Sequence, residues 1–137
     1  MAITVGTELA AFGFTKPTGP SEHSTITVEA ETESCFVNVD FTGTYAQADD
    51  ATFAPAAIIQ AAKRDGKTVT ILQAAFCSAG VSAAGVIYGA NACVNAAGTV
   101  TCELTAEDLT TEYANATPIA AGIRPVCFLV TYHQPIG

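Results

Sequence analysis

The strongest constraint on the fold is a run in which apolar and polar side chains alternate. The apolar side chains of this run share one parity: Cys35, Val37, Val39, Phe41 and Tyr45. The polar side chains share the other parity: Asn38, Asp40, Thr42 and Thr44. Because successive side chains of a strand point to opposite faces of a sheet, this pattern predicts a strand with one packed face and one wet face. Only Phe36 interrupts the alternation.

The preceding residues, 25–33, also alternate. Ile26, Val28 and Ala30 form the apolar side, and the polar side carries the carboxylates of Glu29, Glu31 and Glu33. This predicts a half-buried strand with an acidic, solvated face. These carboxylates, or those of Asp49 and Asp50, could offer oxygens to a hard cation. Neither group has the dense spacing of a calcium loop, so we assign no metal ligand.

Residues 52–64 are rich in alanine and predict a short helix, which Thr52 or Asp50 would cap. Pro55 is tolerated in the first turn of such a helix, and Gly66 would end it. The competing interpretation makes Asp65-Gly66 a hairpin turn between two strands. The residue pattern leaves both interpretations of 53–64 open.

The second half of the chain returns to strand patterns. Residues 67–76 and 86–88 have β character, and 92–94 with 99–104 have the strand, turn, strand order of a hairpin. Val100, Cys102 and Leu104 are its expected inward side chains. Residues 106–113 predict one or two helical turns. The final run, 126–132, is apolar on both faces and predicts a central strand.

One domain is the simplest organisation for a chain of 137 residues without an internal repeat or a linker. Prolines and a glycine in 15–21 prevent regular structure there. We therefore expect an N-terminal arm at 1–20 and a single β-rich domain at 21–137. The expected fold class is mainly β: an antiparallel β-sandwich or barrel-like domain with one or two short helices.

The charge balance argues against nucleic acid as a partner. The chain has 13 acidic and 5 basic residues and a formal net charge of −8. Such a surface repels phosphate backbones. We interpret the three neighbouring basic residues, Lys63, Arg64 and Lys67, as a solvated turn. No apolar run approaches the roughly 18–20 residues that cross a bilayer, and the N-terminus lacks the pattern of a secretory signal. We expect synthesis in a host cytoplasm and no membrane partner.

Cysteine and histidine, the usual metal ligands and nucleophiles, form no motif. The five cysteines, which have no C-x-x-C pair, are Cys35, Cys77, Cys93, Cys102 and Cys127. They are interpreted as small buried residues, although Cys93 and Cys102 could face each other across the hairpin. His23 has no partner motif, and His133 shares strand parity with Cys127 without a third orienting group. We predict no catalytic, metal or cofactor residue and no enzyme.

As a whole, the chain resembles the small β-rich decoration and minor structural proteins of tailed-bacteriophage capsids. The features that carry the resemblance are the arm 1–20, the strand 35–45 running through Asp49-Asp50 into 53–55, the Ala/Gly/Thr-rich middle and the β ending 126–132. The resemblance implies a virion protein that binds an assembled major-capsid lattice, often as a homo-oligomer.

The small residues of the middle segment suit packed interfaces, and equally suit sheet packing within a monomer. A rival function is a glycan- or receptor-binding β-sandwich whose loops present Tyr45, Tyr88 or Tyr113.

Overall fold

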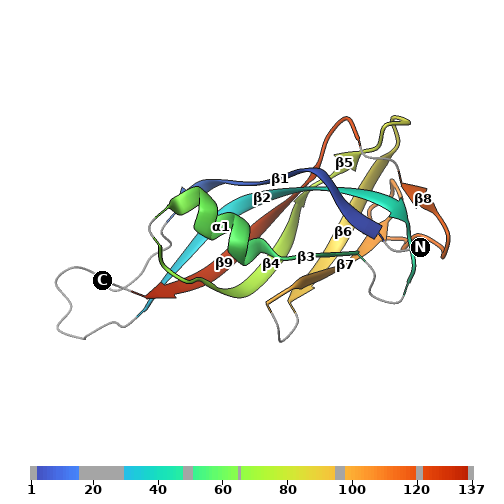
Figure 1. The fold of residues 1–137 in the computed structure, drawn as a ribbon. Helices are drawn as coiled ribbons and strands as arrows, with labels where there is room; N and C mark the ends of the chain where they lie inside the picture. The colour runs from blue at the N-terminus through green and yellow to red at the C-terminus, as the bar shows by residue number, and fades with distance from the viewer. Residues whose placement is uncertain are drawn as a thin grey trace.

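Two antiparallel sheets and one helix make up the part of the chain that the structure describes (Figure 1). The computed structural model describes residues 3–15, 30–47, 51–64, 66–94, 98–119 and 122–135. Its elements in chain order are β1 (Ile3–Thr15), β2 (Ala30–Thr44), β3 (Ala51–Phe53), α1 (Pro55–Lys63), β4 (Thr70–Ser78), β5 (Gly80–Val81), β6 (Ile87–Val94), β7 (Val100–Thr105), β8 (Pro118–Ile119) and β9 (Val126–Pro135). The mainly-β prediction is confirmed.

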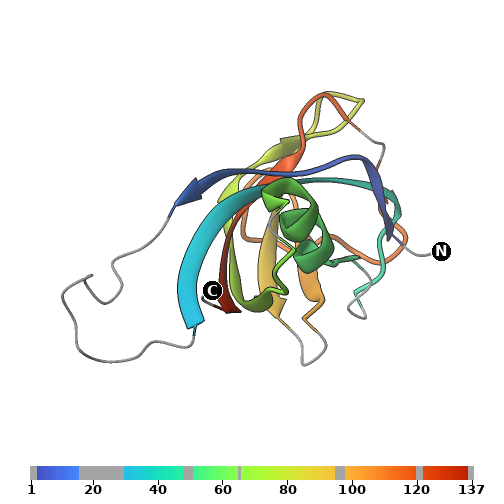
Figure 2. The ribbon, with the colours of Figure 1, turned by 60° about the vertical axis from the view of Figure 1, so that its left-hand side comes forward.

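The larger sheet has the order β1-β2-β9-β4, with β8 paired to one end of β2. The smaller sheet has the order β3-β7-β6-β5. Figure 2 shows the long strand β2 curving, so that the larger sheet wraps partly around the molecule. Strand β9 lies between β2 and β4, as its apolar sequence predicted, and β6 and β7 form the predicted hairpin.

The alternation in β2 places its apolar side chains in the core between the sheets. Val37, Val39 and Phe41 are fully buried, as are Val126, Phe128 and Val130 of β9. From the smaller sheet, Val100, Cys102 and Leu104 complete this core, so their predicted inward direction is confirmed. Each large side chain removed from water in this way contributes roughly 1.5–3 kcal/mol to folding.

Most of the segment expected as an N-terminal arm, 1–20, is a strand of the larger sheet. Residues 3–15 form β1, which pairs with β2 from Ile3↔Gly43 to Thr15↔Ser34. Ile3 is buried, and Val5, Leu9 and Ala11 pack against the core. The backbone ladder together with this burial makes β1 part of the same sheet as the rest of the β-rich unit. The last residues assigned to the arm lie outside the described residues.

Residues 55–63 are helical, so the helix interpretation of this segment is confirmed over the hairpin. Pro55 occupies the first turn, and Ile59 is fully buried in the core. The predicted caps are wrong. Ala54 is the N-cap residue, Thr52 belongs to β3, and Arg64 adopts the left-handed conformation (φ 57°) that ends the helix before Gly66. Asp50 lies outside the described residues.

The second predicted helix, 106–113, is a turn instead. The carboxylate of Asp108 accepts hydrogen bonds from the backbone N–H groups of Thr110 (3.0 Å) and Thr111 (2.9 Å) and from the Thr111 hydroxyl (2.6 Å). Leu109 has a left-handed φ of 62°. A side chain that captures nearby N–H groups competes with helical hydrogen bonds, so the local sequence folds into a tight turn.

Glu33 does not lie on a wet face as predicted. It is buried with the same parity as Cys35 and Val37, and it forms an ion pair with Lys63 at the end of α1. The hydroxyl of Tyr132 (2.9 Å) and the side-chain amide of Gln134 (3.3 Å) also donate hydrogen bonds to its carboxylate. Lys63 is thus a core partner and not part of a solvated basic turn, because a buried carboxylate needs a charged partner.

Candidate functional site

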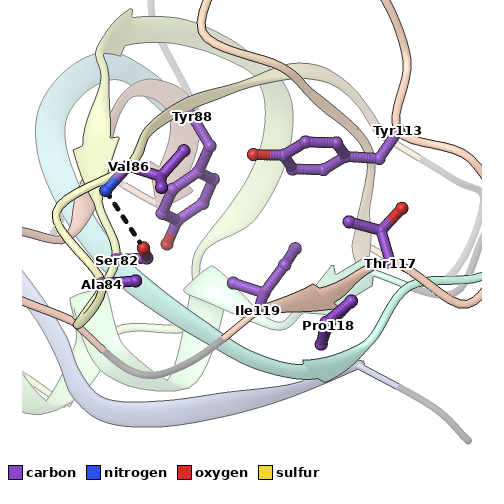
Figure 3. A pocket seen from close by; sticks show the side chains of 8 residues that line it. All are labelled: Ser82, Ala84, Val86, Tyr88, Tyr113, Thr117, Pro118 and Ile119. Atoms are coloured by element: carbon purple, nitrogen blue, oxygen red, sulfur yellow. Dashed lines mark hydrogen bonds between the residues drawn. The ribbon is translucent and has the colours of Figure 1, made fainter.

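The structure contains a hollow of about 460 Å³ at the junction of the two sheets (Figure 3). The residues that line it come from the turn between β5 and β6, from β6, and from β8 with the loop before it. The lining residues are Ser82, Ala84, Val86, Tyr88, Tyr113, Thr117, Pro118 and Ile119. The volume falls within the range of roughly 300–1,000 Å³ that is common for small-molecule sites.

The turn at 82–86 holds one wall of the hollow. The N–H of Ser82 donates to the Val86 carbonyl (2.9 Å), and the N–H of Gly85 donates to the Ser82 carbonyl (2.8 Å). The Ser82 hydroxyl oxygen accepts the N–H of Val86 (3.3 Å). Gly85 has a φ of 80°, which side chains other than glycine's rarely permit. These bonds fix Ala84 and Val86 against the hollow.

Tyr88 forms the buried floor of the hollow and is 1% exposed. Its ring lies so close to Gly80 that a Cβ atom there would approach the ring carbons to 2.9 Å. The hydroxyl oxygen accepts the N–H of Phe41 (3.4 Å). Burial raises the pKa of Tyr88 to about 12, further above physiological pH than that of an exposed tyrosine.

Tyr113 forms the opposite wall, and its hydroxyl points toward Tyr88 (Figure 3). Its backbone N–H donates a hydrogen bond to the Leu104 carbonyl (2.9 Å). Its ring packs edge-on against the ring of Tyr45, with the ring centroids 6.4 Å apart. Burial, with a smaller contribution from Glu107, raises the pKa of Tyr113. Tyr45 itself is buried, and its hydroxyl donates to Glu112, so it supports the site from behind.

The lining of this hollow can bind but offers little for catalysis. Its polar atoms are hydroxyls and backbone groups, and the eight lining side chains include no carboxylate, imidazole, amine or thiol. The half-buried Tyr113 ring can stack on an apolar or sugar-like group, and its phenol can donate a hydrogen bond, whereas the buried Tyr88 ring supports the hollow from below. General acid–base chemistry requires a group that titrates near the working pH, which these residues do not supply.

A second candidate site is the outer face of the larger sheet, which is the face directed away from the core. A row of apolar side chains crosses the four main strands there. Phe12 lies opposite Phe36, Phe36 opposite Leu129, and Leu129 opposite Ala75. The Phe12 and Phe36 rings stack with centroids 5.6 Å apart. Phe12 is 45% and Leu129 37% exposed. We call these four residues the outer apolar row.

Polar, uncharged residues flank the outer apolar row on both sides. Asn38 and Ser78 lie opposite Cys127 on one side, and Ser34 and Gln73 lie opposite Thr131 on the other. Strands β4 and β9 contain no Asp, Glu, Lys or Arg. This absence of charge on two strands stands out in a chain whose net charge is −8.

Gly13 permits the contact between Phe12 and Phe36. It has a φ of 64°, and a Cβ atom at this position would lie 2.8 Å from the Phe36 ring. The β1–β2 register shifts between Phe12 and Thr15, so the chain changes direction here. Phe36 looked like an exception in the alternating sequence, but its place in the row explains an apolar residue on the outer face.

The histidines and carboxylates considered in the sequence do not assemble into a site among the described residues. His133 is exposed at the end of β9, where its ring contacts the Thr32 hydroxyl at 2.9 Å. Cys127 shares its face, as predicted, but lies six residues away, about 20 Å along a strand. Four of these residues lie outside the part of the chain that the structure describes: His23, Glu29, Asp49 and Asp50. For Glu31 the structure describes the backbone alone. Within the described part, no cluster of three such ligands could hold a metal ion.

The cysteines occupy two environments. Cys35 and Cys102 are buried, as expected for small apolar residues, but Cys77 is exposed. Cys102 lies opposite Ala92, and Cys93 lies opposite Thr101. The register therefore does not place Cys93 and Cys102 opposite each other. The side chain of Cys93 is not among those described.

Sequence reasoning offered Tyr45, Tyr88 or Tyr113 as loop contacts of a rival binding module, but Tyr45 and Tyr88 are buried. It did not bring Tyr88 and Tyr113 together. Their segments are separated by β7 and a turn, and only the tertiary fold places both rings at one hollow. The outer apolar row had two signals in the sequence, the break in the alternation at Phe36 and the apolar residues on both faces of β9. None of the helices described here is long and apolar enough to cross a membrane. In comparisons with protein families, curated proteins and solved structures, none matches this chain.

Proposed function

We propose that this chain is a structural virion protein, a capsid decoration protein that binds the assembled major-capsid lattice and copies of itself. The observation that carries the proposal is the outer apolar row, in which Phe12 and Leu129 are exposed and the other two residues half-buried, bordered by uncharged polar residues. Interface cores are poor in charge and rich in aromatic residues, with polar residues at the rim. Exposed apolar patches of this kind commonly mark contacts with other proteins.

The chemistry of the outer apolar row favours a protein partner over a nucleic acid. Phe12, Phe36 and Leu129 offer no cation to a phosphate group. Rigid aromatic rings bury much area at low conformational cost, which suits a contact with a repeating shell. The expected partner surface is therefore apolar at its centre and uncharged. Polar contacts from Asn38, Gln73 and Thr131 would surround it.

The test is incorporation into particles. Particles assembled with the unaltered chain are separated on a density gradient, and the chain is quantified in the fraction of capsid-sized particles. Leu129→Glu places a charge at the centre of the outer apolar row and should strongly reduce incorporation. Ile87→Glu is the matched control, because Ile87 is a 45% exposed apolar residue of β6 in the other sheet.

The two variants separate the possible results. Loss of incorporation with Leu129→Glu and retention with Ile87→Glu supports the proposal. Recovery of the unaltered chain only as a free monomer, with none in the particle fraction, refutes it. Native mass spectrometry on the free chain tests self-association, for which a closed symmetric oligomer is the expected form.

A second candidate function is a glycan- or receptor-binding module, and the hollow between Tyr88 and Tyr113 favours it. A sugar ring presents an apolar face that can stack on a tyrosine and hydroxyls that can bond to the phenol. A panel of oligosaccharides, assayed by calorimetry, tests this function. Binding that disappears in Tyr113→Ala but persists in Leu129→Glu would support the module in place of the virion protein.

A further inference from the structure

Two cysteines lie side by side on the outer face of the larger sheet. Cys127 of β9 pairs in register with Ser78 of β4, and the register shifts between Phe76 and Ser78. Cys77 is the residue inside this irregularity. In a β-bulge, two residues of one strand oppose one residue of the other, so Cys77 and Ser78 both face Cys127. The Cys77 and Cys127 side chains contact each other.

This geometry suits a covalent bond between the two sulfur atoms. Adjacent antiparallel strands bring opposing Cα atoms to about 4.5–5.5 Å, and disulfides span Cα distances of roughly 4.4–6.8 Å. Cys77 is exposed, so a dissolved oxidant can reach it, while Cys127 is half-buried beside it. We propose that Cys77 and Cys127 form a disulfide when the protein meets a small-molecule disulfide such as oxidised glutathione.

The reaction balances with one molecule of oxidised glutathione. The Cys77 thiolate attacks one glutathione sulfur, which releases one reduced glutathione and leaves a mixed disulfide on Cys77. The Cys127 thiolate then attacks the Cys77 sulfur and releases the second glutathione. The two cysteines lose two protons and two electrons, and the glutathione disulfide is reduced to two thiols. Nothing else is consumed.

The bond would join the edge strand β4 to the central strand β9. Among the described strands, β4 pairs only with β9, so the β4–β9 ladder opens more easily than the ladder between β9 and β2. The link also closes a long loop of chain, which restricts the unfolded state. We therefore expect the oxidised protein to unfold at a higher temperature than the reduced protein. This inference does not depend on the proposed function.

The experiment treats the native full-length chain with oxidised glutathione and measures the intact mass. The expected product is lighter by two hydrogens and carries no glutathione. After denaturation, three of the five cysteines should react with an alkylating agent. Proteolytic mapping should recover a peptide pair joined through Cys77 and Cys127. Burial raises the pKa of Cys127, so closure of the mixed disulfide should accelerate as the pH rises.

The Cys77→Ser variant is the matched control, because serine keeps the size and exposure of the site. It should never lose two hydrogens, and its melting temperature should be the same with and without oxidant. Stable glutathione on Cys77 with Cys127 still open to alkylation would overturn the proposal. Disulfide-linked dimers as the main product of the unaltered chain would overturn it as well.

Discussion

Phe128 and Leu129 are neighbours in β9, yet one is fully buried and the other is 37% exposed. Phe128 points to the inner face of the larger sheet, where its ring packs against Phe53 with centroids 4.9 Å apart. Leu129 points to the outer face, between Phe36 and Ala75. The two faces of one strand therefore differ: the inner side chains pack in the core, whereas the outer face leaves Leu129 partly exposed.

The cysteines repeat this difference between the faces. Cys35 lies on the inner face of β2, where burial raises the pKa of its thiol to about 12. Cys77 lies exposed on the outer side of β4. Charged side chains are also distributed differently between the two faces. The inner face holds the Glu33–Lys63 ion pair, whereas β4 and β9 supply no charge to the outer face.

The largest expected difference between the faces is in thiol reactivity. Iodoacetamide at mildly alkaline pH should modify Cys77 at least about a thousandfold faster than Cys35, because Cys35 must wait for the unfolded state. Peptide mass spectrometry after timed quenching measures both rates. Comparable rates under native conditions would show that the inner face opens locally. Denaturant should equalise the two rates.

Removing an inner aromatic ring should be the next largest effect. Phe128→Ala leaves a cavity beside Phe53 and should lower the free energy of unfolding by about 3–5 kcal/mol. Urea denaturation followed by circular dichroism measures the change. A loss of less than about 1 kcal/mol would mean that the inner face collapses around the missing ring and is not a rigid core.

Loss of the Glu33–Lys63 ion pair should lower the free energy of unfolding somewhat less than loss of the Phe128 ring. Lys63→Met keeps most of the length of the side chain but leaves the Glu33 carboxylate buried without its cation, and we expect destabilisation of about 3 kcal/mol. Tyr132 and Gln134 still donate to Glu33, which limits the cost. Adding Glu33→Gln to Lys63→Met should recover part of the stability. A double-mutant cycle in urea measures the coupling between the two substitutions. Additive changes in the free energy of unfolding would contradict an ion pair between Glu33 and Lys63.

Changes on the outer face should affect stability least. Leu129→Glu should alter the free energy of unfolding by about 1 kcal/mol at most, because the side chain is partly solvated in the native state. The same urea titration that is used for Phe128→Ala makes the measurement directly comparable. An effect as large as that of Phe128→Ala would place Leu129 in the folding core and argue against its proposed role as a contact residue.

Much of the fold could be predicted from local patterns. The parity of Val37, Val39 and Phe41 correctly predicted the inner face of β2, and the apolar run in β9 correctly predicted a central strand. Predictions from local patterns were wrong where another side chain bound a group that the predicted structure needed free. Asp108 captured the N–H groups that a helix at 106–113 needed, and Lys63 brought Glu33 into the core.

By itself, the sequence determined which side chains can share a face, because alternation along a strand is a property of neighbouring residues. Only the tertiary structure decided which strands lie next to each other. It paired residues 3–15 with β2, brought Tyr88 and Tyr113 to one hollow, and placed Cys77 against Cys127. Such contacts join residues that are far apart in the chain, so their energy depends on the sheet order and register, which no local pattern contains.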